Sequence, residues 1–509
     1  MEILQMQNSS EQDLAEQSNF KFSWKDLFQY FGPGLLISIA YLDPGNLAGD
    51  MEAGLVGKYS LLWVLFLSTA LGYLFQVKSM KLGLVTGKDL AKLCRIHLNS
   101  KERTLLWIMA EIAIMGSDIQ EVLGTAIGLK ILFGLELWIG VLLTIFTTFL
   151  ILLVKICGMR SLEAVFALLI GTMAICFFIN LGYIQPNPLD ILKGMVVPTI
   201  PSGAYLASIG LLGAVIMPHN IYLHSALMNE KNIDKNDKKL VSKSIFYFKI
   251  ETALSLLLSF LISGSVICTF AYYSNQNQVE SGDIKLSNAG DVLAGSFGQF
   301  AKYIWGIGLL ASGQSSTLTG TLAGQYVMSG FIKMKMGDFS RALLTRSIAI
   351  IPSVVIAFVN ENEDFNIYLN LLQAIQLPFA IIPLLKFSSN QYIMGQDAIQ
   401  QNELIFLSVA SSLIVISNYY CLMPQKIDFS SKLTYFMIFI CLLYFVFLIY
   451  VLVSKIAVKP KKYSDEISIN RKSPQNIDIE DIENNHINSQ DQNSEISQRN
   501  QVLGDKEQK

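Results

Sequence analysis

The sequence predicts an all-α polytopic membrane protein, because it is strongly apolar, it is poor in charge, and its apolar residues form long segments. Of its 509 residues, 52% are hydrophobic and 15% are charged, and the mean hydropathy is +0.44. This composition excludes an ordinary soluble globular protein, so we expect the lipid bilayer, and no nucleic acid, as a partner. A helix needs about 17 to 25 apolar residues to cross a bilayer, and about twelve segments meet this requirement. They span residues 32–56, 60–80, 105–129, 135–154, 162–184, 203–228, 244–272, 298–330, 342–359, 366–387, 403–421 and 433–454.

The distribution of basic residues predicts how these segments are oriented. Lys and Arg gather after the second, sixth, eighth and twelfth segments, and loops rich in these residues stay in the cytoplasm. Because the number of segments is even, both termini are expected in the cytoplasm. The first 24 residues are polar and lack an apolar stretch, so we expect no cleavable signal peptide. The plasma membrane and an acidic endosomal or vacuolar membrane are both expected locations.

Two tetrapeptides interrupt the first and the sixth apolar segments. They are Asp43-Pro44-Gly45-Asn46 and Met217-Pro218-His219-Asn220. Proline removes a backbone donor and clashes with the preceding turn, so both helices should unwind near the middle of the bilayer. Unwound backbone is tolerated there only where it is buried in protein or lines a polar cavity. Paired interruptions in two halves of a chain therefore indicate a transport site.

The side chains at the two interruptions are candidate ligands for a metal or carriers of a proton. Asp43 and Asn46 offer hard oxygen atoms, whereas the thioether of Met217 is soft and favours softer metals. A methionine in an apolar helix more often fills a gap in the core, so both interpretations of Met217 stay open. His219 and His224 are five residues apart, about 140° around a helix, which suits a proton relay better than one shared metal. Neutral packing histidines are the alternative.

The third apolar segment carries three acidic residues, Glu111, Asp118 and Glu121. Their offsets of seven and three residues place them on one helix face. Ionisable groups inside a bilayer are costly, so these acids need basic partners, water or protonation. The candidate partners on later segments are Lys249, Glu251 and Arg346. Such a set is typical of a proton path, and a structural network of ion pairs is the alternative.

Over residues 25–455 the chain resembles the Nramp (natural resistance-associated macrophage protein) family of proton-coupled divalent metal transporters. The two tetrapeptides look like the hallmark motifs of that family. Two further motifs are similar to those of its helices 8 and 10. They are Gly313-Gln314-Ser315-Ser316-Thr317-Leu318-Thr319-Gly320-Thr321 with Ala323-Gly324-Gln325, and Leu369-Asn370-Leu371-Leu372-Gln373 with Gln376-Leu377-Pro378-Phe379-Ala380.

The resemblance implies a LeuT-like inverted-repeat (5+5) fold with two extra helices, in which helices 1 and 6 are broken. The ten-helix transport core would be 25–388 and the additional helices 389–458, between a cytoplasmic segment 1–24 and a disordered cytoplasmic tail 459–509. The implied metal ligands are the side chains of Asp43, Asn46, Met217 and Asn370 and the backbone carbonyls of Ala40 and Ala214. The implied proton path consists of Asp43, His219, Glu121, Asp118, Glu111 and Arg346, and His224 is a further candidate.

The function that the resemblance implies is secondary transport, so no enzyme activity and no prosthetic group are expected. Mn²⁺ or Fe²⁺ would move toward the cytoplasm together with H⁺ by alternating access. A carrier of another small substrate and a membrane metal sensor or receptor are the alternatives, although Asp43 would repel an anionic substrate. Four residues depart from the family pattern: Asn370, Thr345, Ser263 and Ser329 stand where Gln, Arg, Asn and Glu are frequent.

Overall fold

Helices form all the regular structure of the described residues, and no strand occurs among them. The computed structural model describes residues 22–156, 159–231, 233–277, 284–332, 338–359, 365–422 and 432–456. Most of the expected N-terminal segment 1–24, the whole expected tail 459–509 and the side chain of Arg346 lie outside this description.

The first half of the chain contains α2 (Trp24–Tyr30), α3 (Pro33–Ala40), α4 (Pro44–Gly57), η1 (Lys58–Leu61), α5 (Leu62–Thr86), α6 (Leu90–His97), α7 (Ser100–Phe133), α8 (Leu137–Ile156), α9 (Met159–Ile184), α10 (Pro188–Val196), α11 (Tyr205–Val215) and α12 (Pro218–Glu230). The second half contains α13 (Lys238–Asn277), α14 (Ala289–Phe297), α15 (Gln299–Phe331), α16 (Asp338–Val359), α17 (Phe365–Gln376), α18 (Pro378–Ser388), α19 (Gln391–Met394), η2 (Gly395–Asp397), α20 (Gln401–Leu422) and α21 (Lys432–Val453).

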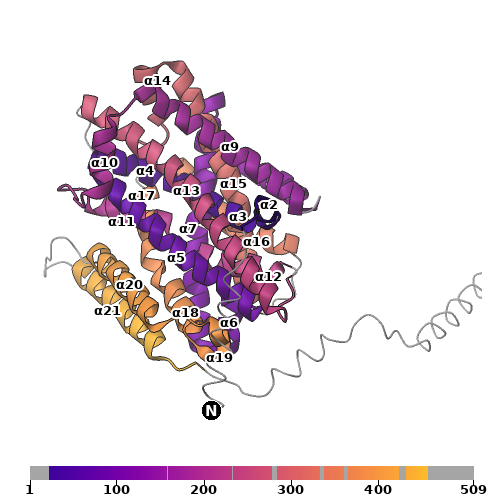
Figure 1. Ribbon diagram of the computed structural model, residues 1–509. Helices are drawn as coiled ribbons and strands as arrows, with labels where there is room; N and C mark the ends of the chain where they lie inside the picture. The colour runs from indigo at the N-terminus through magenta and orange to yellow at the C-terminus, as the bar shows by residue number, and fades with distance from the viewer. Residues whose placement is uncertain are drawn as a thin grey trace, which may run out of the picture. The chain divides into compact units, whose positions relative to one another are not determined.

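Every apolar segment that the sequence predicts overlaps one of these helices or a pair of half-helices (Figure 1). By length and apolar composition, eight helical segments of the described residues are able to cross a membrane. The prediction of an all-α polytopic protein is therefore confirmed, whereas twelve crossings stay a prediction. The first predicted segment is split into α3 and α4, and the sixth is split into α11 and α12.

Helices α7 and α15 pack against each other along their lengths, and glycines allow their close approach. A Cβ atom on Gly313 of α15 would lie 2.2 Å from Thr125 Oγ1 of α7. A Cβ atom on Gly128 of α7 would lie 3.1 Å from the backbone nitrogen of Leu310. Close packing leaves no room for larger side chains at these positions.

Helix α13 follows the first broken helix along both of its halves. The Glu251 carboxylate accepts two backbone N–H groups at the start of α3, at 2.6 and 3.0 Å. Ser259 Oγ donates to the Ser38 carbonyl at 3.0 Å, and Ser274 Oγ donates to the Leu55 carbonyl at 2.9 Å. These contacts fix α3 and α4 to one continuous helix even though the chain between them is not helical.

Helices α20 and α21 lie side by side and pack against α18 (Figure 1). A polar cluster ties the end of α21 to the rest of the molecule. Lys386 Nζ donates to Ser454 Oγ at 2.6 Å and to the Val451 carbonyl at 2.7 Å. Ser454 Oγ in turn donates to Glu102 Oε1 of α7 at 2.5 Å. The two last helices are thus anchored to the helices that precede them in the chain.

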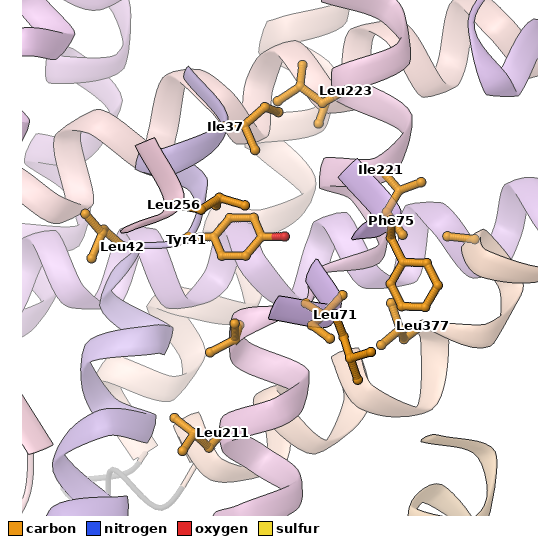
Figure 2. Close-up of a cluster of buried hydrophobic side chains, with 14 of the residues drawn as sticks. Ile37, Tyr41, Leu42, Leu71, Phe75, Leu211, Ile221, Leu223, Leu256 and Leu377 are labelled. Atoms are coloured by element: carbon orange, nitrogen blue, oxygen red, sulfur yellow. The ribbon is translucent and has the colours of Figure 1, made fainter. Parts of the chain in front are cut away.

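Buried apolar side chains surround the first helix break. Figure 2 shows Tyr41 and Leu42, from the break itself, among Leu71 and Phe75 of α5 and Leu211 of α11. These five side chains are all buried. A close-packed apolar surrounding excludes water from the break, so its polar groups need partners within the protein.

Candidate functional site

The first break lies between Ala40, the last residue of α3, and Pro44, the first residue of α4. Side chains from three other helices bind the carbonyl groups of this region. Ser259 of α13 donates to Ser38 O at 3.0 Å, Asn220 of α12 donates to Ala40 O at 3.4 Å, and Ser312 of α15 donates to Leu42 O. The unwound backbone is therefore buried in protein with these acceptors satisfied, as a membrane interior requires.

Asp43 and Asn46 occupy the N-terminal turn of α4, where free N–H groups favour negative charge. Asp43 caps the helix: one carboxylate oxygen accepts the Asn46 N–H at 2.6 Å, and the other accepts Ser117 Oγ at 3.4 Å. Both side chains are only 1% exposed. Within the described part of the chain, neither amide atom of Asn46 has a hydrogen-bond partner. Asn46 therefore keeps an oxygen available to a bound ion.

The second break lies between Val215, the last residue of α11, and Pro218, the first residue of α12. Met217 occupies this break, is 1% exposed and has extended backbone angles. Ser79 Oγ of α5 donates to the Ile221 carbonyl at 2.5 Å, which holds the first turn of α12. The thioether of Met217 is thus buried beside unwound backbone rather than within a regular helix.

The two breaks contact each other. The Asn220 amide, from the second tetrapeptide, donates to the Ala40 carbonyl that ends α3. A Cβ atom on Gly49 of α4 would lie 3.6 Å from Ala214 Cβ of α11, so the second half of the first broken helix packs on the first half of the second. The structure therefore brings together the two segments that carry Asp43 and Met217.

Asn370 has both ends of its side-chain amide engaged. Its Nδ2 donates to the Gly45 carbonyl at 3.0 Å, and its Oδ1 accepts Gln120 Nε2 at 2.8 Å. Gln120 Oε1 also accepts Gln373 Nε2 at 3.0 Å. Asn370 lies next to the break, as expected of a ligand, but here it braces α4 against α7. Gln120 is missing from the sequence-based candidates, although a polar residue between Asp118 and Glu121 in an apolar segment was a signal.

The acidic residues of α7 face α15. Asp118 and Glu121 are 2% and 1% exposed, and a Cβ atom on Gly320 would lie 2.9 and 2.8 Å from their carboxylate oxygens. Glu111, which is partly exposed, accepts the indole N–H of Trp107 at 2.8 Å. Asp118 and Glu121 therefore lie close together on one face of α7, as their spacing predicts.

Two of the expected partners of these acids lie elsewhere. Glu251 caps α3, because its carboxylate matches the free N–H groups of that helix. Lys249 is exposed, and its charged neighbours include Lys78 and Glu403. The described contacts of Glu251 and Lys249 are thus with groups other than the acids of α7, and their pairing with these acids stays a prediction.

Both histidines of α12 are buried, at 2% exposure for His219 and 0% for His224. His224 Nδ1 lies 3.0 Å from Gln76 Oε1, and Gln76 Nε2 donates to the Tyr41 hydroxyl at 3.5 Å. Among the described residues, His219 Nδ1 and His224 Nε2 have no hydrogen-bond partner. His224 is therefore linked through Gln76 to the first break, and His219 directly follows the proline of the second.

Comparisons with known proteins agree with this arrangement. The family model described as natural resistance-associated macrophage protein-like matches residues 34–424. The metal transporter Nramp3 of Arabidopsis thaliana is 43% identical over 460 residues, which are 88% of this chain and 90% of that protein. A metal transporter of Dictyostelium discoideum, an nramp1 homolog, is 43% identical over 81% of this chain and 77% of its own length.

Solved structures show the same fold. A crystal structure of a manganese transporter mutant from Eremococcus coleocola aligns with a TM-score of 0.75 at 29% sequence identity, and covers 84% of this chain and 94% of that one. Sequence, fold and the two proline-containing breaks lead to one conclusion. The chain belongs to the natural resistance-associated macrophage protein (Nramp) family of metal transporters.

Proposed function

We propose that the protein is a secondary transporter that carries Mn²⁺ or Fe²⁺ into the cytoplasm together with protons. The observation that carries this proposal is the contact between the two helix breaks. It joins the Asn220 amide to the Ala40 carbonyl, beside a buried Asp43 carboxylate and an Asn46 amide without described partners. Such a junction of unwound helices at mid-membrane suits a small cation.

The proposed metal shell combines hard and soft ligands. Asp43 and Asn46 would supply side-chain oxygens, the carbonyls of Ala40 and Ala214 would supply backbone oxygens, and Met217 would supply sulfur. Sulfur favours Mn²⁺ and Fe²⁺ less than it favours still softer metals, but it disfavours Mg²⁺ and Ca²⁺ strongly. Asn370 would enter the shell through its Oδ1, which accepts Gln120 Nε2 and has a second lone pair for a cation. None of the described residues forms a cluster of three or more His, Cys, Asp or Glu suited to a resident metal.

The proposed proton path starts at Asp43 and His219 and continues along α7. The burial of Asp118 and Glu121 beside Gly320 supports this path, because two carboxylates side by side each disfavour the charged form of the other, which favours the uptake of a proton. Glu111 and Arg346 would lead it toward the cytoplasm, and His224 would join it through Gln76. The basic residues Lys88, Lys92 and Arg95, which follow α5, support a cytoplasmic location of that end.

Mn²⁺ uptake into proteoliposomes with an inward proton gradient tests the proposal. The purified wild-type protein should take up Mn²⁺ and acidify the lumen. The Asp43→Asn variant should do neither, because it keeps a capping side chain but loses the charge that neutralises the cation. Uptake by Asp43→Asn at the wild-type rate would overturn the site, and no uptake by the wild-type protein would overturn the function.

A deletion separates a transporter from a metal sensor that signals through its tail. Removal of residues 465–509 should leave Mn²⁺ uptake unchanged, since all the proposed ligands precede this segment. A sensor would instead bind Mn²⁺ without transport in both the full-length and the shortened protein.

A further inference from the structure

Asp50 is a buried acidic residue of α4 that the proposed metal shell and proton path leave unused. Its side chain is 0% exposed, and among the described residues neither carboxylate oxygen has a hydrogen-bond partner. An ionised carboxylate in a protein interior is costly unless it is paired. Most buried carboxylates have donors, as Asp43 and Glu251 do here. Asp50 is therefore a group whose ionised form a bound cation would stabilise.

The position of Asp50 on α4 relates it to the first break. Asp50 follows Asp43 by seven residues and Asn46 by four. With 100° per residue, these three side chains lie within about 60° of one another around the helix, and Asp50 lies roughly 10 Å further along its axis. Asp43 is also an electrostatic neighbour of Asp50. One face of α4 thus carries a carboxylate, an amide and a second carboxylate in a row.

Helix α13 completes the surroundings of this row. Ser263 of α13 is the polar neighbour of Asp50. One turn further along both helices, a Cβ atom on Gly54 would lie 2.5 Å from the Ile267 carbonyl, so the backbones are in close contact there. The Asp50 carboxylate therefore lies in the seam between α4 and α13, beside a hydroxyl oxygen.

The direction of α4 places this seam on the external side of the proposed metal site. Helix α4 leads from Asp43 through η1 into α5, and α5 ends just before the basic segment that contains Lys88, Lys92 and Arg95. Because that segment is expected in the cytoplasm, the start of α5 and the end of α4 face the opposite side. A cation that approaches Asp43 from outside would pass Asp50 first.

We propose that Asp50, with the Ser263 hydroxyl, forms an outer binding site for the divalent cation. This inference rests on the proposed transport function and adds a residue to it. Carboxylate and hydroxyl oxygens are hard ligands that bind Mn²⁺ as well as Mg²⁺ and Ca²⁺. The outer site concentrates divalent cations without selecting among them, and selection is left to the inner site that contains Met217.

Uptake kinetics with a matched control test the outer site. In proteoliposomes, Asp50→Asn should raise the KM for Mn²⁺ by about tenfold, because a carboxylate on the external side of the inner site raises the local cation concentration, and should leave the maximal rate near the wild-type value. Glu52→Gln removes the same charge from the same helix, about 200° away from Asp50, and should leave KM unchanged. An unchanged KM in Asp50→Asn overturns the outer site. It leaves the transport function intact, because Mn²⁺ uptake by the wild-type protein tests that function separately.

Equilibrium binding provides a second test that does not depend on transport. Electron paramagnetic resonance of Mn²⁺ should detect residual weak binding to Asp43→Asn, and this binding should disappear in Asp43→Asn combined with Asp50→Asn. Equal binding by these two variants overturns the proposal. A shift in the pH dependence of uptake with no change in KM would also overturn it, since Asp50 would then hold a proton rather than the metal.

Discussion

At the scale of single residues, each break is supported by groups that do two tasks at once. Asp43 caps α4 and is the proposed charged ligand, and Pro44 begins the second half-helix and packs on α7. The sequence predicts the chemistry of these residues well, because proline, aspartate and methionine have strong local signatures. It does not predict the partners of Asn370, because Gly45 and Gln120 are far from it in the chain.

Asp50 shows why a residue can be overlooked even when its signal is present. It lies within the predicted segment 32–56, where an ionisable group is unexpected. Glu52 follows it near the expected end of the segment, so the sequence suggests that Asp50 belongs to the polar end of the membrane-spanning helix. Only its complete burial between α4 and α13 distinguishes it.

Met217 is predicted to decide between metals. The Met217→Ala variant should still transport Mn²⁺, but its discrimination against Ca²⁺ should fall roughly tenfold, which corresponds to about 1.4 kcal/mol. Competition of Ca²⁺ with Mn²⁺ uptake measures this. Met228→Ala, which removes a buried thioether within α12, is the control and should keep the discrimination against Ca²⁺. If Met217→Ala still excluded Ca²⁺, the soft-ligand argument would be wrong.

Gly124 is predicted to be irreplaceable because Pro44 packs directly against it. A Cβ atom on Gly124 would lie 2.1 Å from Pro44 Cβ, and the proline ring cannot turn away. Gly124→Ala should lower the free energy of unfolding by about 1 to 3 kcal/mol, as overpacking does, and should reduce uptake.

Thermal unfolding in detergent measures this effect against Gly171→Ala. Outside its own helix turn, no atom of the described residues lies within 4 Å of a Cβ built on Gly171 of α9, so this control should unfold at the wild-type temperature or above it. Equal unfolding temperatures for the two variants would contradict the packing argument.

At the scale of elements, the broken helices keep their shape because neighbouring helices replace the missing hydrogen bonds. Hydropathy and proline positions predicted that the first and sixth segments are interrupted near Pro44 and Pro218, since these signals are local. The donors that satisfy the break come from α12, α13 and α15, and no local pattern identifies them.

Ser312 is predicted to stabilise the first break from α15. Its hydroxyl donates to the Leu42 carbonyl, so Ser312→Ala should leave a buried acceptor unpaired and cost about 1 to 3 kcal/mol. Ser417→Ala is the control, because the Ser417 hydroxyl bonds only within its own exposed helix turn. Hydrogen exchange of the α3 and α4 amides should rise in Ser312→Ala alone; unchanged protection would show that the bond is dispensable.

At the scale of the whole molecule, the amino-acid sequence predicted the all-α membrane fold and the Nramp family, and both are confirmed. The hydrophobic pattern shows which segments can form membrane-spanning helices. The resemblance of the motifs to those of the family indicates how these helices are arranged. The number of crossings and the proton coupling depend on the membrane and on the transport cycle, so they stay predictions.

Proton coupling is predicted to depend on the acids of α7. Wild-type Mn²⁺ uptake should increase as the external solution becomes more acidic, whereas Asp118→Asn should flatten this dependence by removing a proton carrier. Uptake and lumenal pH recorded together across a range of external pH measure the coupling. Asp291→Asn is the control and should keep the wild-type pH dependence. Asp291 forms an exposed ion pair with Lys302 of α15. A wild-type pH profile in Asp118→Asn would favour a purely structural network.

The Ala40 carbonyl oxygen would interact with both the Asn220 amide and the bound metal ion. It accepts the Asn220 amide at 3.4 Å, and the proposed metal shell uses the same oxygen. A cation draws electron density from the oxygen that binds it, so a bound metal would weaken the hydrogen bond from the Asn220 amide to this oxygen. Metal binding would then loosen the contact between α3 and α12, and metal release would restore it. The contact between α3 and α12 would therefore be more flexible in the metal-bound protein than in the metal-free protein.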